Sequence, residues 1–506
     1  MHGQKRAEYK ARLLHPDTRA KLGSKAQQWN HLSEELLKQR RRLFASPPPL
    51  SDMDTTEKTE NDGNTATAAA PSPEVLLSLT EKMLSVNPDP SHLWNVRREM
   101  LVYLIHNQQD VGDDTSSKPS TLDIEAERKL TAHCLQRNPK SYSAWFHRKW
   151  ALVYFMNGTS QTNGEHWTNM KAILQSEFEL CVQFLQLDER NFHCWNFRRF
   201  VVGLLGSCGG SDDVTIATSS ENDVDGNNVD SDAPATPSSA DSFSGSWSAW
   251  MHQIENENKD VWMMGPQISQ NACRAVGMSS SCRGGSNNSY ATKSTTAPLS
   301  KRELEKIIMN EWDFSTAKIQ DNFSNGSAFH YRSKLLPLVL EFRYDSASSP
   351  SEADEAITLV REEWDGILLD AIFTEPDDQT IWFYHRFIVT WARRTIGDAG
   401  ADAEVTEEFE DLLYDMVDSI QELIDVEKED NVEVNTQDRH ESKGAKCKWA
   451  YLGMHLVLTT LLELKSNEDD HNKTELRERA KECLEELMII DSDRRERYQI
   501  LESELT

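Results

Sequence analysis

One lysine of this chain stands where its charge could meet an anion. Lys140 lies in a turn at residues 138–142, two positions before Tyr142, between two amphipathic segments. A lysine ammonium is a compact point charge that suits a phosphate group. Four other turns match this one, and at the same place they carry Asp89, Arg190, Ser324 and Asp377. The residues alone leave open whether Lys140 binds an anion or is an ordinary solvated side chain.

The turn belongs to a repeat that occurs five times along the chain. Each copy has a turn, an aromatic anchor, and an arginine three or four residues after the anchor. The pairs are Trp94 with Arg97, Trp145 with Arg148, Trp195 with Arg198, Phe329 with Arg332, and Trp382 with Arg386. Neighbouring anchors are 50 to 53 residues apart, except across one interval that holds a period plus about 80 inserted residues.

A period of this length accommodates two helices and their turns, because helices average about 11–12 residues. Residues three apart share a helix face, so Trp145 and Arg148 point the same way. We expect the indole in the core and the guanidinium on carbonyl groups left free at a neighbouring helix end. No alternating strand pattern occurs in the ordered parts. The sequence therefore predicts an all-α fold, a curved right-handed stack of antiparallel helical hairpins forming an α-α superhelix.

Composition divides the chain into six parts. They are a basic N-terminal arm and helix (1–45), a flexible linker (46–73), repeats 1–3 (74–205), a low-complexity and mostly disordered insertion (206–300), repeats 4–5 (301–395), and C-terminal helices with a degenerate final repeat (403–506). The insertion is assigned from its serine, glycine, asparagine and aspartate, which cannot bury a core.

The net charge of −29 argues against a nucleic-acid binder, which needs a stripe of lysine and arginine. The eight cysteines form no Cys-x-x-Cys pair and read as reduced thiols of a cytosolic protein. The charged N-terminus does not look like a secretory signal. The apolar run at 456–464 is among the longest and falls short of a bilayer span. We therefore expect a cytoplasmic protein with no membrane span and no nucleic-acid partner.

The repeats resemble those of the protein prenyltransferase α subunits, helical hairpins marked by Trp-x-x-Arg after an Asn-Pro turn. Three stretches look like the type II, or Rab geranylgeranyltransferase, branch of that family. They are Met1-His2-Gly3, the segment 188–195 with Phe192, and Trp382-Phe383-Tyr384-His385-Arg386. The resemblance covers 74–205 and 301–395 well. It is closest to a fungal-like form, because the leucine-rich repeats of mammalian α subunits have no counterpart here.

This resemblance implies an α subunit that wraps a β subunit, and the β subunit would hold a catalytic zinc and the isoprenoid pocket. The heterodimer would transfer geranylgeranyl from geranylgeranyl diphosphate to C-terminal cysteines of Rab GTPases presented by a Rab escort protein. This chain would be active only with the β subunit. Lys140 would contact the diphosphate and stabilise charge on the leaving group, with Tyr142 supporting the same edge. His2 would visit the partner's zinc in the resting enzyme, or else belong to a disordered terminus.

Two other classes of protein compete with this interpretation. A non-catalytic scaffold of the tetratricopeptide kind has a period of about 34 residues, which the observed spacing of 50 to 53 disfavours. An isoprenoid diphosphate synthase is also all-α, but it needs paired aspartates with a third at helical spacing to hold Mg²⁺. The Asp-Asp pairs of this chain lack that third residue.

Overall fold

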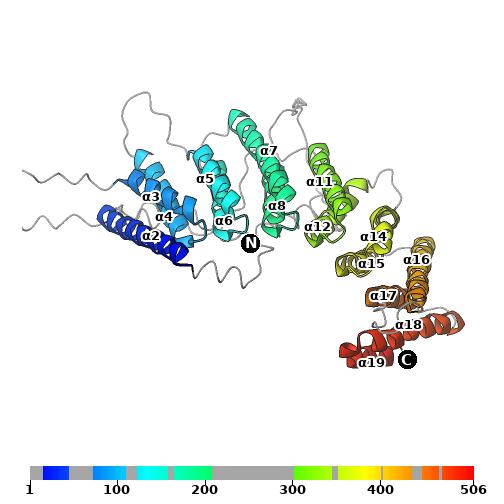
Figure 1. Ribbon diagram of the computed structural model, residues 1–506. Coiled ribbons are helices and arrows are strands. Elements are labelled where there is room, and N and C mark those ends of the chain that lie inside the picture. Colours follow the sequence, from blue (N-terminus) through cyan, green and yellow to red (C-terminus); the bar gives the residue numbers. More distant parts are fainter. Residues whose placement is uncertain are drawn as a thin grey trace, which may run out of the picture. The chain divides into compact units, whose positions relative to one another are not determined.

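Two compact groups of helices make up the described part of the chain, shown in the computed structural model of Figure 1. The structure describes residues 15–44, 72–109, 122–157, 164–207, 253, 301–344, 351–399, 403–435, 447–465 and 470–505. Every regular element in these ranges is a helix, which confirms the all-α prediction. The division between the two groups falls within one helix, α7, between Glu177 and Phe178.

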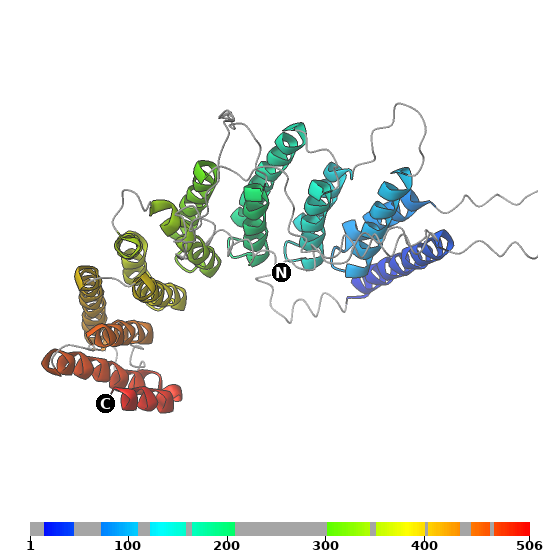
Figure 2. The ribbon, with the colours of Figure 1, turned by 180° about the vertical axis from the view of Figure 1, so that it is seen from behind.

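The first unit is built from pairs of antiparallel helices preceded by a single helix. Its elements are α2 (Pro16–Leu43), α3 (Pro73–Val86), α4 (Ser91–Gln109), α5 (Ile124–Arg137), α6 (Tyr142–Asn157) and the first part of α7 (Gly164–Leu187). Helix α3 pairs with α4 and α5 pairs with α6, while α2 packs on α3 (Figures 1 and 2). An ion pair of 2.9 Å from Arg40 to Glu99 also ties α2 to α4.

The second unit continues the same hairpin architecture. Its elements are the rest of α7, α8 (Phe192–Ser207), α11 (Lys301–Asp321), α12 (Gly326–Arg343), α13 (Glu352–Glu363), the π-helical segment η3 (Trp364–Leu368), α14 (Leu369–Thr374), α15 (Gln379–Ala399), α16 (Ala403–Asn435), α17 (Lys448–Leu464), α18 (Asp470–Ile490), the 3₁₀ segment η5 (Ser492–Arg494) and α19 (Arg495–Glu504). The hairpin partners are α11 with α12, α13 with α15, α16 with α17, and α18 with α19.

Local signals explain where several helices begin. The Asp123 carboxylate accepts the Ala126 N–H at 3.0 Å and caps α5. Ser351 and Asp354 form a capping box at the start of α13, each side chain accepting the other's backbone N–H. These caps satisfy N–H groups that the first helical turn leaves without partners.

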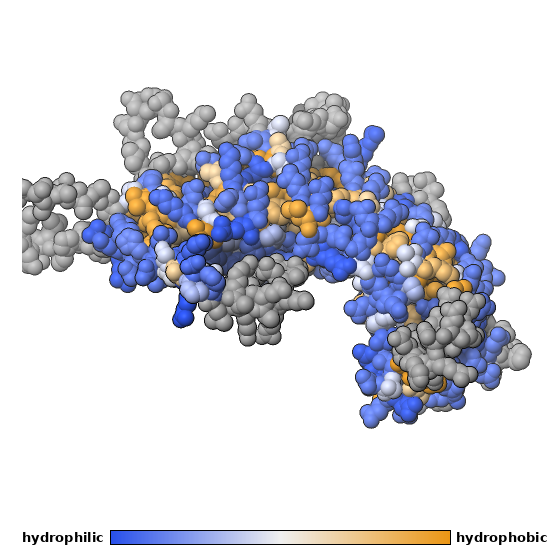
Figure 3. All heavy atoms as spheres, in the orientation of Figure 1, coloured by the Kyte–Doolittle hydropathy of each residue, from blue (hydrophilic) through white to orange (hydrophobic). Residues whose placement is uncertain are grey.

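The core of each unit lies between its helices, whose outward faces are polar. The face drawn in Figure 3 is largely hydrophilic, with smaller groups of hydrophobic residues among the hydrophilic ones. The bulkiest fully buried side chains include Trp94, Trp150 and Trp364. At Gly453 on α17 the ring of Trp382 approaches so closely that a Cβ atom would lie 2.5 Å from the ring carbon Cζ3. Glycine there allows α17 to pack against the fifth repeat.

Several sequence predictions lie outside the described residues. They include His2, nearly all of the linker 46–73 and nearly all of the insertion 206–300. Among the helices that the structure does describe, none has an apolar stretch long enough to cross a bilayer.

Candidate functional site

The tryptophan anchors fix each turn to the helix that follows it. In four repeats the indole N–H donates to the carbonyl oxygen six residues earlier. The pairs are Trp94 with Pro88 (2.8 Å), Trp145 with Pro139 (2.9 Å), Trp195 with Glu189 (2.8 Å) and Trp382 with Pro376 (2.8 Å). Phe329 has no ring donor and instead packs its buried ring on Tyr384, with centroids 4.9 Å apart. The anchor therefore sets the geometry of the turn as well as filling the core.

The arginine of each of the first four repeats pairs with a buried glutamate on the first helix of the next hairpin. In every pair Nε and one terminal nitrogen donate to the two carboxylate oxygens. The pairs are Arg97 with Glu127, Arg148 with Glu177, Arg198 with Glu311, and Arg332 with Glu363, at 2.5–2.9 Å. All eight side chains are at most 6% exposed. Such bidentate hydrogen bonds between charged groups are strong, and they fix the orientation of the guanidinium relative to the carboxylate.

Three of these arginines also bond a carbonyl within the first helix of their own hairpin, rather than at a helix end as the sequence predicts. Arg97 donates to Leu77 O at 3.0 Å, Arg148 to Arg128 O at 2.7 Å, and Arg332 to Trp312 O at 3.1 Å. The glutamates were not anticipated, because each lies 29 to 113 residues from its arginine, in a different helix. A signal was present nonetheless, since Glu127, Glu177 and Glu311 all precede their anchors by 18 residues.

Each glutamate accepts one more hydrogen bond. In three repeats its donor stands two residues after the anchor: His147 to Glu127 (2.8 Å), Tyr331 to Glu311 (2.7 Å) and Tyr384 to Glu363 (2.6 Å). The third repeat has Phe197 at that position, and Arg128 donates to Glu177 at 2.6 Å. Although burial raises the pKa of Glu127, bonds from His147 and Arg97 lower it to about 2. The Glu127 carboxylate is thus ionised, and both oxygens of each of the four carboxylates accept hydrogen bonds.

The fifth repeat departs from this pattern at its arginine. The sequence predicts Arg386 as an anchor residue, but the structure corrects this assignment: Arg386 is exposed, and His385 holds the buried position three residues after Trp382. The first helix of the next hairpin, α16, offers no buried carboxylate to an arginine at this position, since every buried residue in its described part is apolar. A buried arginine without a carboxylate carries a large desolvation penalty, whereas a neutral imidazole carries a smaller one, even though neither ring nitrogen of His385 has a hydrogen-bond partner among the described residues. Burial lowers the pKa of His385 to about 4.

The turns are also joined to one another along one edge of each unit. In the first unit, Asn138 donates to the Asp89 carboxylate at 2.8 Å and Ser141 to Pro88 O at 3.1 Å. In the second, Asn325 donates to Glu189 O at 3.2 Å. Turn-to-turn bonds therefore add to the anchors in holding this edge rigid.

Lys140 and Tyr142 stand together on this edge in the first unit. The Lys140 backbone N–H donates to the Asn138 side chain at 3.2 Å, which fixes the turn. Both side chains are exposed, Tyr142 by 69%. They lie at the N-terminal end of α6, where the helix dipole favours an anion. The arrangement is a fixed turn that presents one ammonium and one aromatic ring outward.

Apart from Arg386, the anchor residues lie in the interior and carry no exposed chemistry. The aromatic rings of all five anchors are at most 4% exposed. Within the described ranges there is no cluster of three or more histidine, cysteine, aspartate and glutamate side chains placed to hold a metal ion. The candidate site is therefore the edge that carries Lys140 and Tyr142, and the anchors position it.

Comparison with known families agrees with this geometry. Residues 124–155 and 174–205 match the family described as "Protein prenyltransferase alpha subunit repeat", and these stretches cover most of the hairpins of the second and third repeats. These two stretches are therefore similar to prenyltransferase alpha-subunit repeats, and they lie in a chain whose described elements are all helices.

Among individual proteins, the chain is similar to those named Geranylgeranyl transferase type-2 subunit alpha. It is 27% identical to the Rattus norvegicus protein over 316 residues, which cover 62% of this chain and 34% of that one. It is 21% identical to the Candida albicans protein over 432 residues, or 83% and 82% of the two chains. The chain spans about a third of the length of the mammalian relatives it matches and most of the fungal one.

The arginine–glutamate pairs predict a large and specific loss of stability on disruption. Arg148→Ala leaves Glu177 buried with part of its charge uncompensated, so the free energy of unfolding should fall by about 3–5 kcal/mol. Arg386→Ala is the matched control, because Arg386 is exposed, and it should change stability by less than about 0.5 kcal/mol. Urea unfolding followed by circular dichroism measures both. Similar effects of the two variants would contradict the role assigned to the buried pair.

The buried histidines predict a loss of stability in mild acid. Burial lowers the pKa of both His147 and His385 to about 4, below the ordinary value of about 6.5. As the pH falls, the histidines of the unfolded chain therefore bind protons at a higher pH than those of the folded chain. The stability that is present above pH 6.5 should be lost as the pH falls toward 4. His385→Phe should make unfolding midpoints less sensitive to pH across this window. The exposed His133→Gln control should keep the dependence of the unaltered chain.

Proposed function

We propose that this chain is the α subunit of a heterodimeric Rab geranylgeranyltransferase, active only with its β subunit. The observation that carries the proposal is the rigid edge bearing Lys140, in a repeat array similar in sequence to type-2 α subunits. The reaction would move geranylgeranyl from geranylgeranyl diphosphate to C-terminal cysteines of Rab GTPases presented by a Rab escort protein. The complex would work in the cytoplasm.

Lys140 is the residue of this chain proposed to take part in the chemistry. Breaking the bond between the isoprenoid carbon and the diphosphate leaves negative charge on the departing oxygens. An ammonium held nearby before the reaction begins stabilises that charge without reorganisation. The bonds that hold the turn, from Trp145 to Pro139 and from Asn138 to Asp89, limit its movement. Tyr142, exposed beside it, would form part of the same contact surface.

The β subunit would supply the rest of the active site. Zinc held by the β subunit would activate the acceptor thiolate, since a metal-bound thiol is deprotonated. His2 is proposed as a resting-state ligand of that zinc, because a neutral imidazole is a common zinc ligand. In this division of labour the α chain provides a scaffold and one positive charge, and the β chain provides metal and lipid pocket.

A non-catalytic tetratricopeptide-like scaffold is the other candidate, and the observations do not favour it. Its period of about 34 residues differs from the spacing of 50 to 53 seen here. The repeat family matched by residues 124–155 and 174–205 is also a different one.

Co-expression with a type-2 β subunit tests the proposed function. The two chains should co-purify, and the pair should transfer geranylgeranyl to a Rab GTPase with an escort protein, while this chain alone should transfer none. Within that complex, Lys140→Ala should lower the single-turnover rate about 10- to 100-fold and leave geranylgeranyl diphosphate binding nearly unchanged.

The control for this variant is Lys129→Ala, which removes an exposed lysine from α5, the helix before the same turn. It should leave the rate unaltered. An unchanged rate for Lys140→Ala would remove this residue from the mechanism. A heterodimer that forms but transfers nothing would instead reject the assignment of the chain to this enzyme.

A further inference from the structure

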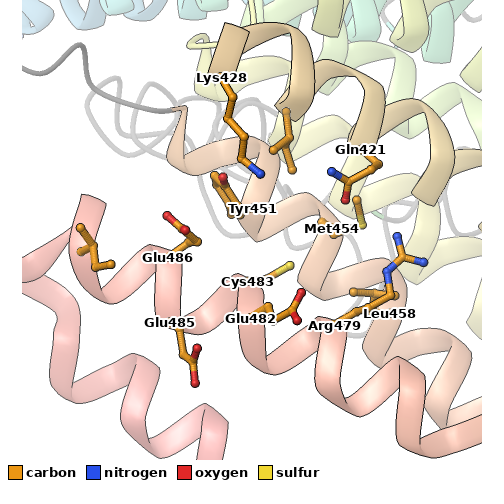
Figure 4. Close-up of a pocket in the computed structure, with 12 residues that line it drawn as sticks. Gln421, Lys428, Tyr451, Met454, Leu458, Arg479, Glu482, Cys483, Glu485 and Glu486 are labelled. Atoms are coloured by element: carbon orange, nitrogen blue, oxygen red, sulfur yellow. The ribbon is translucent and has the colours of Figure 1, made fainter. Parts of the chain in front are cut away.

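A pocket far along the sequence from Lys140 lies among three helices of the second unit. Its volume is about 310 Å³, and its walls come from α16, α17 and α18 (Figure 4). The floor is apolar and buried, formed by Ile424, Met454 and Leu458. In Figure 4, Gln421 and Lys428 extend from α16 toward Tyr451 and Met454 on α17, and α18 brings Glu482, Cys483 and Glu486 to the other side.

The Tyr451 hydroxyl is an unsatisfied polar group in this pocket. The side chain lines the pocket and is only 6% exposed, yet its oxygen has no hydrogen-bond partner among the residues that the structure describes. Burial raises the pKa of Tyr451 well above its ordinary value, and nearby Glu486 and Glu427 raise it further. The phenol is therefore neutral and keeps its O–H donor at physiological pH. A buried donor without a partner is rare in proteins and is unfavourable until something accepts its hydrogen bond.

The rim of the pocket is predominantly acidic on one side. Helix α18 contributes three carboxylates, those of Glu482, Glu485 and Glu486. The lining has two basic side chains, Lys428 on α16 and Arg479 on α18. The same rim carries Ile489, a large apolar side chain that is 70% exposed. An apolar floor beside an acidic rim suits a group that is apolar at one end and positively charged at the other.

We propose that this pocket docks a segment of a partner polypeptide in which a large apolar side chain stands next to a lysine or arginine. The apolar side chain occupies the floor at Met454 and Leu458. The basic side chain meets the carboxylates of α18, and the Tyr451 hydroxyl donates to a main-chain carbonyl of the segment. The net charge of −29 on the whole chain also favours the approach of a basic partner.

A positional-scanning library of synthetic hexapeptides tests the proposal on the full-length chain, with binding rather than prenyl transfer as the measurement. Peptides that place Leu, Phe or Met beside Lys or Arg should be enriched. Those with Asp or Glu in the basic position should bind at least about tenfold more weakly. Enrichment of acidic peptides, or no enrichment above a scrambled library, would overturn the proposal.

Two changes at the pocket separate docking from a purely structural role. Tyr451→Phe removes only the unpartnered hydroxyl, so the selected peptide should bind about five- to tenfold more weakly while thermal stability stays the same or rises. The double variant Glu482→Gln with Glu485→Gln should weaken binding by a similar factor.

The matched control is Glu475→Gln with Glu478→Gln, two exposed residues of the same helix that do not line the pocket. It removes equal charge from α18 and should leave peptide affinity unaltered. Equal affinities for the control and both pocket variants would refute the docking site, as would binding that falls only in proportion to total charge.

Discussion

The buried arginine–glutamate pair is the interaction on which the array depends. It joins the second helix of one hairpin to the first helix of the next, with both charged groups removed from water. Because an ion pair in the interior is stable only when both partners are present and well oriented, it fixes the register between hairpins more strictly than apolar packing does. The extra donor on each glutamate, from histidine, tyrosine or a second arginine, completes the pairing.

Rigidity at the turn edge follows from this interior. The indole bond to the turn carbonyl and the bonds between adjacent turns are made by residues in or next to the turns. The helices that these turns connect are held in position by the ion pairs. A side chain on such a turn, as Lys140 is, can be held near a reacting group although it is exposed. The interior pairs and the proposed chemistry are therefore linked mechanically, without sharing any residue.

Much of this architecture could be predicted from the sequence, and the failures are instructive. The aromatic anchors and their arginines are local patterns, so the hairpins and the all-α fold were accessible. The glutamate partners were missed because they belong to the next repeat. The prediction for Arg386 was wrong because it looked for an arginine near Trp382 and not for the residue three positions after it. That buried position is filled by His385. The unsatisfied hydroxyl of Tyr451 depends on packing among three helices, which no sequence spacing reveals.

The π-helical segment after Glu363 shows how such an array can change length. Glu363 precedes Trp382 by 19 residues, whereas the spacing elsewhere is 18, and the segment Trp364–Leu368 accommodates the additional residue within one wide turn. Glu363 keeps its bonds to Arg332 and Tyr384 despite the insertion. In this repeat an additional residue between the glutamate and its following anchor leaves the ion pair intact, whereas Arg386, one residue further from its anchor than the other arginines, is exposed. The length of chain before an anchor can therefore change by one residue without breaking the ion pair, whereas the length between anchor and arginine cannot.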